Sequence, residues 1–412
     1  MKNPYATDFS HTNLCLRPNL QTEQEWGNNM GIYLDYNASA PIDRRVLERM
    51  IEVYQNVYGN ADSRTHHFGD QARKIVENAR EQVASLLAIN KDEVIFTSGA
   101  TESDNIAIQG LKSYGISANK KHIITTSIEH KAVLESAKAM QKQGFEVEFI
   151  DPDETGRVLI QDVLNKVREE TLLVSIMHVN NETGIIQPVK EIGELLTDRD
   201  ILFHIDATQS FGKLVDELKE TRYSMLSMSA HKLGGPQGVG ALILRKEKYK
   251  FPPVKAIMYG GQQEYGIRPG TVPVALAAGL GKACELAQAE YIDNSKKCRM
   301  IKNRLIELLK QSGLHYKMNG EQEYCVSNTM NLCICGVSSE ALMLATKDYC
   351  GISNGSACNS NSYKPSYVLT AMGVPANQVE NSIRVSWGPE ISVEEIEQSF
   401  GRMLEIARGL VW

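Results

Sequence analysis

The chain has 412 residues, of which 42% are hydrophobic and 23% are charged, and its formal net charge is -6. This length exceeds what one small core can organise, so we expect two domains. The mildly acidic balance argues against direct nucleic-acid binding, and the lack of a membrane-length apolar run or a signal-peptide core predicts a cytoplasmic protein without a membrane partner.

Residues 1–31 are polar and irregular, and we expect an extension ahead of the fold. From residue 32 to about 280, short apolar runs alternate with amphipathic segments such as 70–87 and 188–196. The expected strands lie at 32–35, 94–97, 122–125, 147–150, 172–176, 202–205 and 240–244. Strands that are apolar on both faces and alternate with helices predict an α/β fold, with a mostly parallel, seven-stranded sheet covered by helices on both sides.

The pattern changes after residue 270. A long helical stretch over 274–309 is followed by a strand at 329–334, a helix at 338–347, a loop rich in Gly, Ser and Asn, and a closing helix at 393–410. This order predicts a smaller α+β domain whose boundary lies inside the long helical region. We therefore expect a large domain over 32–280 and a small C-terminal domain over 281–412.

Cysteines are scattered rather than regularly spaced, at positions 15, 284, 298, 325, 333, 335, 350 and 358. Reduced thiols in a cytosolic protein fit this spacing better than a disulfide framework. Cys333 and Cys335 could be half of a metal site, but they lie in an apolar strand-like run, where packing is the more frequent role of cysteine. No metal site is predicted.

Lys232 is the first candidate for chemistry, because it ends the run Ser229-Ala230-His231-Lys232 directly before a glycine-rich stretch. Upstream, the apolar segment 202–205 closes on Asp206. An amine beside hydroxyl and imidazole groups, with a carboxylate at the end of the preceding strand, suits a lysine that forms a Schiff base with pyridoxal phosphate. The alternative is that Lys232 is a solvated surface charge and Asp206 a helix N-cap.

The run from Thr97 to Asn105 follows a predicted strand and opens a helix. Backbone N–H groups and the Thr101 hydroxyl at such a helix start can hold a phosphate, although a turn of this composition is more often only a helix cap. Glu129 and His130 follow another strand, and His130 could stack on a cofactor ring and move protons, or be structural.

Together these runs resemble the cysteine desulfurases, within the class V branch of the fold-type I pyridoxal phosphate enzymes. The resemblance spans roughly residues 32–410 and rests on ordered runs at 33–38, 58–66, 97–105, 129–133, 177–182, 204–210, 229–232, 268–271, 353–358 and 365–369. The run at 260–266 departs from the pattern Gly-Gly-Gly-His-Glu-Arg-Gly of the family.

The resemblance implies a role for each matching position. Lys232 would hold the cofactor and later move the substrate α-proton, Asp206 would pair with the ring nitrogen, and His130 would stack over the ring. The substrate carboxylate would bind Arg384, with Asn37 and Asn181 on the same side. The ring oxygen would be contacted by Asn181 and Gln209, and the phosphate would be held by Ala100, Thr101, Ser229, His231 and, from a partner subunit, Thr271.

Cys358 lies in the polar segment Gly355-Ser356-Ala357-Cys358-Asn359-Ser360-Asn361-Ser362, which offers little to pack against. A cysteine in such a loop is a plausible nucleophile, although an incidental surface thiol is the other interpretation. The loop resembles the longer form of group I desulfurases.

The predicted function is that of a homodimeric L-cysteine desulfurase that makes L-alanine and a persulfide on Cys358 for a sulfur-acceptor protein. The pathway could be iron–sulfur assembly, tRNA thiolation or DNA phosphorothioation. The alternatives are a selenocysteine lyase, a class V aminotransferase, or a scaffold of a sulfur pathway that binds acceptor proteins.

Overall fold

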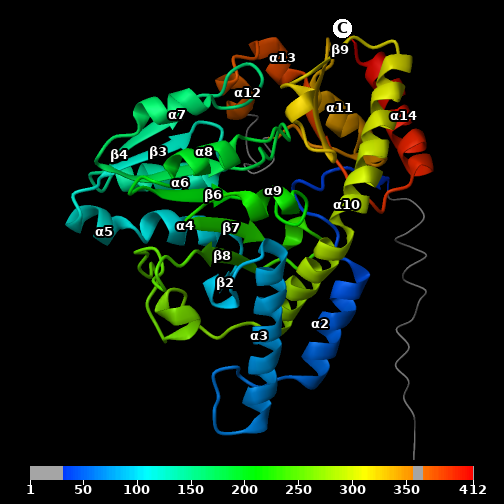
Figure 1. Cartoon of the computed structure of the whole chain (residues 1–412). Coiled ribbons are helices and arrows are strands. Elements are labelled where there is room, and N and C mark those ends of the chain that lie inside the picture. Colours follow the sequence, from blue (N-terminus) through cyan, green and yellow to red (C-terminus); the bar gives the residue numbers. More distant parts are fainter. Residues whose placement is uncertain (1–30, 356–364, 412) are drawn as a thin grey trace, which may run out of the picture.

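A seven-stranded sheet forms the centre of the computed structural model, which describes residues 31–355 and 365–411. The spatial order of its strands is β2 (Val94–Thr97), β8 (Gly240–Leu244), β7 (Met225–Ser229), β6 (Leu202–Asp206), β5 (Thr171–Met177), β3 (His122–Thr126) and β4 (Glu146–Ile150). β8 runs antiparallel to both of its neighbours, and the other neighbouring pairs are parallel. The predicted mostly parallel α/β sheet is confirmed (Figure 1).

Alternate residues of these strands feed two apolar cores on opposite faces of the sheet. Phe96, Val174 and Ile243 belong to one core, and their chain neighbours Ile95, Leu173 and Leu242 belong to the other. The first core is covered by α3 (His67–Leu87), α7 (Ile160–Lys166), α8 (Val189–Leu196), α9 (Val215–Glu220) and the start of α10 (Val274–Gln311). The second core is covered by α4 (Ala100–Gln109) and α6 (Lys131–Gln141), which precede and follow α5 (Lys112–Ser117) and β3 along the chain.

The membership of the sheet differs from the sequence prediction at two strands. The predicted strand at 32–35 is reduced to β1 (Ile32–Tyr33), which pairs with β11 (Cys350–Gly351) outside the large sheet. Its place as seventh strand is taken by β7, which the prediction missed because serines interrupt its apolar run. All five residues of β7 are nevertheless buried, since serine is small enough to pack inside a parallel sheet.

A second layer is built by the C-terminal part of the chain. Its antiparallel sheet has the order β12 (Ser382–Ser386), β10 (Thr329–Ile334) and β9 (Tyr316–Met318). The core beneath it combines β10 and β12 with the end of α10 and with α14 (Val393–Gly409), and Leu34 from the start of the fold joins it. The smaller helices of this part are α11 (Ser339–Thr346), α12 (Tyr367–Ala371) and α13 (Ala376–Glu380). Because β1 and Leu34 pack here rather than on the large sheet, the division at residue 280 stays a prediction.

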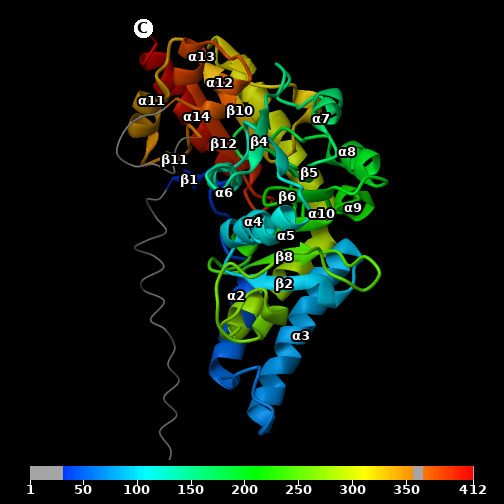
Figure 2. The same cartoon turned by 90° about the vertical axis from the view of Figure 1, so that its left-hand side faces the viewer.

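α10 connects the two layers as one continuous helix of 38 residues. In both views α2 (Arg44–Asn56) and α3 lie along its first half, and α14 lies beside its second half (Figures 1 and 2). Within residues 31–355 and 365–411, no helix combines the length and the apolar character that a membrane span requires.

Candidate active site

Most of the predicted site residues follow the carboxyl ends of parallel strands. Asp206 closes β6 and Ser229 closes β7, while His130 and Asn181 lie just beyond β3 and β5. Ligands of open α/β sheets bind at this edge. Lys232 reaches the same edge because a short 3-10 turn, η2 (Ala230–Lys232), follows β7 directly.

The Lys232 amine donates to the backbone carbonyls of Asn37 at 2.6 Å and Ala38 at 2.7 Å. The Asn37 carbonyl also accepts from Gln209 Nε2 at 2.9 Å. The Asn37 side chain is only 3% exposed and donates through Nδ2 to the Asn181 carbonyl at 3.2 Å. Three segments that are distant in the sequence therefore meet at Lys232.

Arg384 extends this network from β12 of the C-terminal layer. Its Nη1 donates to the same Asn181 carbonyl at 2.9 Å, and its Nη2 pairs with Asp35 Oδ1 at 2.6 Å. The residue is 4% exposed, and its Nε has no hydrogen-bond partner among the residues that the structure describes. A guanidinium with a donor to spare can bind one more anionic group.

Asp206 ends β6, and His130 directly precedes α6. Asp206 is 4% exposed, and its Oδ1 accepts from the backbone N–H of Thr208 at 2.9 Å. His130 caps α6, because its Nδ1 accepts from the Ala132 N–H at 3.2 Å. Burial lowers the pKa of His130; the charge of Asp206 opposes this shift and the charge of Lys232 adds to it. Its lowered pKa therefore keeps the imidazole uncharged at neutral pH.

The predicted phosphate cradle is formed where α4 begins against β7 and β8. Gly99 precedes α4 with φ +149, and a Cβ built on it would lie 3.5 Å from Ser229 Oγ. Gly240 of β8 has to be a glycine, because a Cβ there would lie 2.7 Å from Gly99 Cα. The first turn of α4, which holds Ala100 and Thr101, thus opens beside the Ser229 hydroxyl, and backbone N–H groups at such a helix start attract anions.

His231 follows Ser229 by two residues and faces Ser39. Its Nδ1 is 3.2 Å from Ser39 Oγ. Burial, and after it the charge of Lys232, lowers the pKa of His231 to about 4. The ring is therefore uncharged at neutral pH and can offer a hydrogen bond but no positive charge.

A polar network buried behind Asp206 was missed by the sequence prediction. His204 lies two residues before Asp206 on β6, and its ring nitrogens are 2.8 Å from Ser175 Oγ and 2.9 Å from Ser227 Oγ. Asp104 of α4 is fully buried, with Oδ1 3.6 Å from His204 Nε2. Burial, and after it the charge of Asp206, raises the pKa of Asp104 well above its usual range. The positions of both residues within the runs 97–105 and 204–210 were the available signal.

Several buried polar atoms around Lys232 have no partner among the described residues, which tests whether the predicted cofactor fits. They include the amide oxygens of Asn181 and Gln209, the Thr208 hydroxyl and the Arg384 Nε. Leaving such atoms unpaired costs about 1–3 kcal/mol each, so they call for a polar ligand. An amine, an acid at a strand end, free amide groups and a helix start beside a hydroxyl are what pyridoxal phosphate requires.

Two predicted residues are not part of this cluster. Thr271 is exposed, three residues beyond Arg268, whose Nε pairs with Glu102 on α4 at 2.9 Å, so its role in a neighbouring subunit stays a prediction. Cys358 lies outside the described residues. Among the described cysteines, Cys284, Cys298, Cys325, Cys333 and Cys350 are buried, and burial raises the pKa of each thiol.

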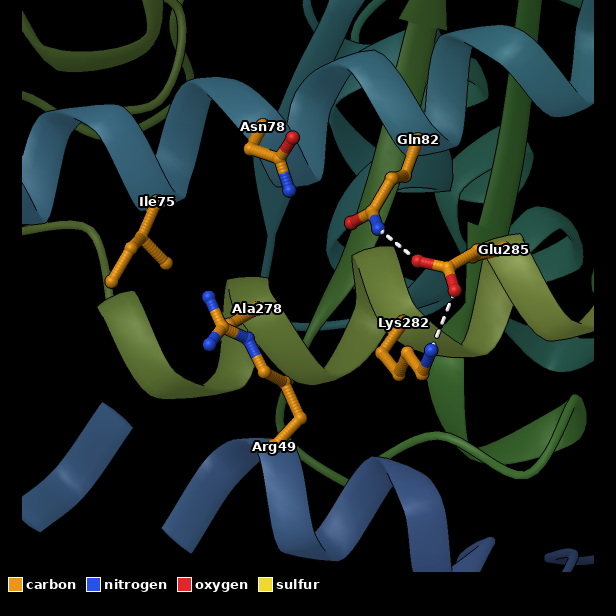
Figure 3. A pocket seen from close by; sticks show the side chains of 7 residues that line it. All are labelled: Arg49, Ile75, Asn78, Gln82, Ala278, Lys282 and Glu285. Carbon is orange, nitrogen blue, oxygen red and sulfur yellow. Dashed lines mark hydrogen bonds and ion pairs between the residues drawn. The ribbon is translucent and has the colours of Figure 1, made fainter. Parts of the chain in front are cut away.

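A cavity of about 260 Å³ lies between α2, α3 and α10, and none of the predicted site residues lines it (Figure 3). Three of its polar side chains pair with one another, since Glu285 accepts from Gln82 at 2.6 Å and from Lys282 at 2.5 Å. A second polar group joins His122, Glu146 and Glu148 at the start of β3 and β4. Arg168 and Lys166 pair with its two carboxylates, so we assign no metal there.

Comparison with known proteins places the chain in a family. The family model described as aminotransferase class-V matches residues 32–398. A curated relative, cysteine desulfurase IscS of Anaeromyxobacter dehalogenans (strain 2CP-C), is 42% identical over 381 residues, which cover 92% of this chain and 93% of the relative.

Solved structures agree with this placement. A NifS-like protein superposes with a TM-score of 0.84 at 34% identity, over 92% of this chain and all of its own. DndA from Streptomyces lividans superposes with a TM-score of 0.76 at 40% identity, over 87% of this chain and 99% of its own. The chain belongs to the aminotransferase class-V family and, within it, to the cysteine desulfurases.

Proposed function

We propose that this chain is a pyridoxal phosphate-dependent L-cysteine desulfurase, which converts L-cysteine to L-alanine and leaves a persulfide on Cys358. The observation that carries the proposal is the network from the Lys232 amine through Asn37 and Asn181 to Arg384. This network supports the proposed roles of Lys232 and Arg384 because it connects the two residues, and the cysteine desulfurase relatives support the substrate class.

Pyridoxal phosphate, when bound, withdraws electrons from the α-carbon of an amino acid. In our proposal Lys232 would hold it covalently, Asp206 would pair with its ring nitrogen, and His130 would stack on its ring. The side-chain amides of Asn181 and Gln209 would line the ring-oxygen side of the cofactor. The phosphate is held by Ala100, Thr101, Ser229 and His231, and by Thr271 of a second copy of the chain.

The substrate is oriented by its carboxylate. Arg384 binds this carboxylate, because its spare Nε and planar geometry suit a carboxylate better than a lysine would, and Asn37 and Asn181 line the same side. Lys232 would remove the α-proton of the substrate. Because Arg384 is buried, water would be excluded from its ion pair with the substrate carboxylate, and this pair would be stronger than in solvent.

Sulfur is then taken by a thiolate. In our proposal the Cys358 thiolate attacks the substrate sulfur, so that an S–S bond forms and the C–S bond breaks. The electron pair of the C–S bond stays on the substrate carbon, which takes up a proton to give alanine. The buried cysteines suit this role poorly, because a thiol with a raised pKa supplies little thiolate at neutral pH; the pKa of Cys298, for example, is about 12.

The decisive experiment is to add L-cysteine to the purified, cofactor-loaded protein and to follow alanine together with the mass of the peptide containing Cys358. We expect both products from the wild type. Cys358→Ser should lose the persulfide, and Lys232→Ala should form neither product. A keto acid with an aminated cofactor would identify an aminotransferase instead. No turnover without an added partner would favour a scaffold.

The remaining proposals concern the setting of the enzyme. We propose a cytoplasmic homodimer that passes sulfur to an acceptor protein in iron–sulfur assembly, tRNA thiolation or DNA phosphorothioation. The similarity to IscS and that to DndA are nearly equal, at 42% and 40% identity, so we name no single acceptor. The division into an extension, a large domain over 32–280 and a small domain over 281–412 is likewise proposed.

A further inference from the structure

Glu182 is a buried carboxyl group that the proposed reaction does not use. It is 2% exposed and lies in the turn directly after Asn181. The Asn180 side chain fixes this turn, since its Oδ1 accepts from the N–H groups of Glu182 and Thr183, both at 2.9 Å. The Glu182 carbonyl accepts from Asn331 Nδ2 of β10 at 3.1 Å, which ties the turn to the C-terminal layer.

The Glu182 carboxyl contacts both sides of the segment 356–364. Ser366, just after this segment, donates through its hydroxyl to Glu182 Oε2 at 2.5 Å. The same hydroxyl caps α12 by accepting from the Leu369 N–H at 3.1 Å. Gly355, the last described residue before the segment, has φ +80, and a Cβ built on it would lie 2.5 Å from Glu182 Oε2. The carboxyl therefore fills the space where a side chain at position 355 would be.

The same contacts lead back to the substrate side of the site. The Gly355 N–H donates to Ser353 Oγ at 3.2 Å, and the backbone of Ser353 pairs with that of Arg384. Glu182 thus connects the turn that carries Asn181 to Gly355 and Ser366, which border the segment with Cys358.

We propose that Glu182 is a positioning residue for Cys358: one buried carboxyl fixes Gly355 and Ser366 relative to Asn181 and Arg384, and so sets where the thiol is delivered. This inference rests on the proposed desulfurase function and deepens it. It predicts that Glu182 affects sulfur capture by Cys358 and leaves the earlier reaction of the cofactor with L-cysteine unaffected.

The charge of Glu182 gives the proposal a distinctive pH dependence. Burial raises the pKa of Glu182 to about 7, opposed by the hydrogen bond from Ser366 and by the positive charges of Arg384 on β12 and Lys131 on α6. Above this pH the carboxylate accepts a charge-assisted hydrogen bond from Ser366, and below it the weaker bond of a neutral acid remains. Glutamine keeps an amide oxygen in the same place but cannot gain the charge.

The test compares cofactor-loaded wild type and Glu182→Gln after rapid mixing with L-cysteine between pH 6 and 8. We expect the spectral change of the cofactor to keep its rate, and persulfide formation on Cys358 to slow about tenfold at pH 8, as loss of a hydrogen bond to a charged group predicts. The ratio of the two persulfide rates should approach one at pH 6, because Glu182 is then mostly protonated and uncharged, like glutamine. Ionisation of the Cys358 thiol also depends on pH, but it is common to both proteins and cancels in the ratio. Equal persulfide rates at every pH would overturn the inference.

Ser366→Ala removes the same bond from the other side and keeps the test independent of how well Glu182→Gln folds. It should show the same selective loss, and the double variant should be little slower than either single one, because both changes break one interaction. Ser338→Ala is the matched control, since it removes the N-cap of α11 elsewhere in the C-terminal layer and should leave every rate unchanged. An unaffected Ser366→Ala protein would contradict the inference. A wild type that yields neither alanine nor persulfide would instead contradict the proposed function.

Discussion

At the scale of single residues, the site is defined by polar groups that are buried before any ligand is bound. Asn181, Gln209 and Arg384 each present an atom without a partner among the described residues. Such atoms lower the stability of a protein, so their concentration around Lys232 indicates a site shaped for a polar ligand. Their separate contributions can be measured.

Arg384→Lys should raise KM for L-cysteine by at least about tenfold and change kcat less, because lysine replaces a planar, multiple donor by a single point charge. Steady-state measurement of alanine against L-cysteine concentration checks this. Arg49→Lys is the control, since Arg49 forms an exposed pair with Glu52 at 2.6 Å, away from the predicted site residues. An unchanged KM in Arg384→Lys would show that the substrate carboxylate binds elsewhere.

Glu129 should make the protein less stable as pH rises. Burial raises its pKa to about 8, whereas in the unfolded chain the pKa of glutamate is about 4.3. Between these values the folded state holds a proton that the unfolded state has lost, so the free energy of unfolding falls as pH rises from about 5 to 8.

Glu129→Gln cannot lose a proton, and its melting temperature should therefore fall less over this pH range than that of the wild type. Thermal unfolding of the cofactor-loaded proteins at several pH values measures the difference. Glu135→Gln serves as control, because Glu135 is exposed on the next helix and Lys138 lowers its pKa. Parallel curves for wild type and Glu129→Gln would show that Glu129 is ionised in the folded state.

At the scale of elements, one buried ion pair holds the segment that departs from the family pattern. Glu264 and Tyr265 lie in η3 (Gln263–Gly266) with φ +48 and +59, a conformation that costs free energy for residues other than glycine. Glu264 offsets this cost: it accepts from Arg80 Nη1 at 2.8 Å, from Arg80 Nη2 at 2.7 Å and from the Phe96 N–H at 2.7 Å. The segment that leads to Thr271 is thereby attached to α3 and β2.

Glu264→Gln should lower the free energy of unfolding by about 3 kcal/mol, because it removes the buried partner of Arg80 and leaves only the partly exposed pair with Glu77 at 3.3 Å. Denaturant unfolding gives this value directly. Glu290→Gln breaks the partly exposed pair with Arg45 and should cost no more than about 1 kcal/mol. If both variants lost the same stability, the pair of Arg80 and Glu264 would have no special role.

At the scale of the whole molecule, the proposed dimer makes two copies of the chain share each active site. Lys232→Ala and Thr271→Val homodimers should both be impaired, the first in catalysis and the second in affinity for the cofactor. In a mixed dimer, the site with an intact Lys232 receives its threonine from the Lys232→Ala copy and is therefore complete.

Mixing the two variants should thus restore up to about half of the wild-type activity per mixed dimer, because one of its two sites is intact. Alanine production after unfolding and refolding the two proteins together measures the recovery, and each variant refolded alone is the control. Activity that stays at the sum of the separate variants would show that Thr271 acts within its own chain.

From the sequence alone one can predict which groups would carry the chemistry, because these groups lie in short local runs. Lys232 after a strand, Asp206 at a strand end and the helix start at residues 99–101 can be recognised without knowing their neighbours. The alternation of strands and helices likewise predicted the parallel sheet and the long helix α10, since hydrophobic periodicity is a local property. The predicted role of Cys358 depends on the sequence alone, because this residue lies outside the described residues.

Which distant segments meet is seen only in the folded chain. β1 pairs with β11 more than 300 residues away instead of joining the large sheet, and β7 is recognised as a strand by its burial between β6 and β8. Glu182 reaches Ser366, and Asp104 reaches His204, through contacts that depend on the packing of whole layers. A local pattern fixes what a residue can do, whereas its partners are set by long-range packing, which no local pattern encodes.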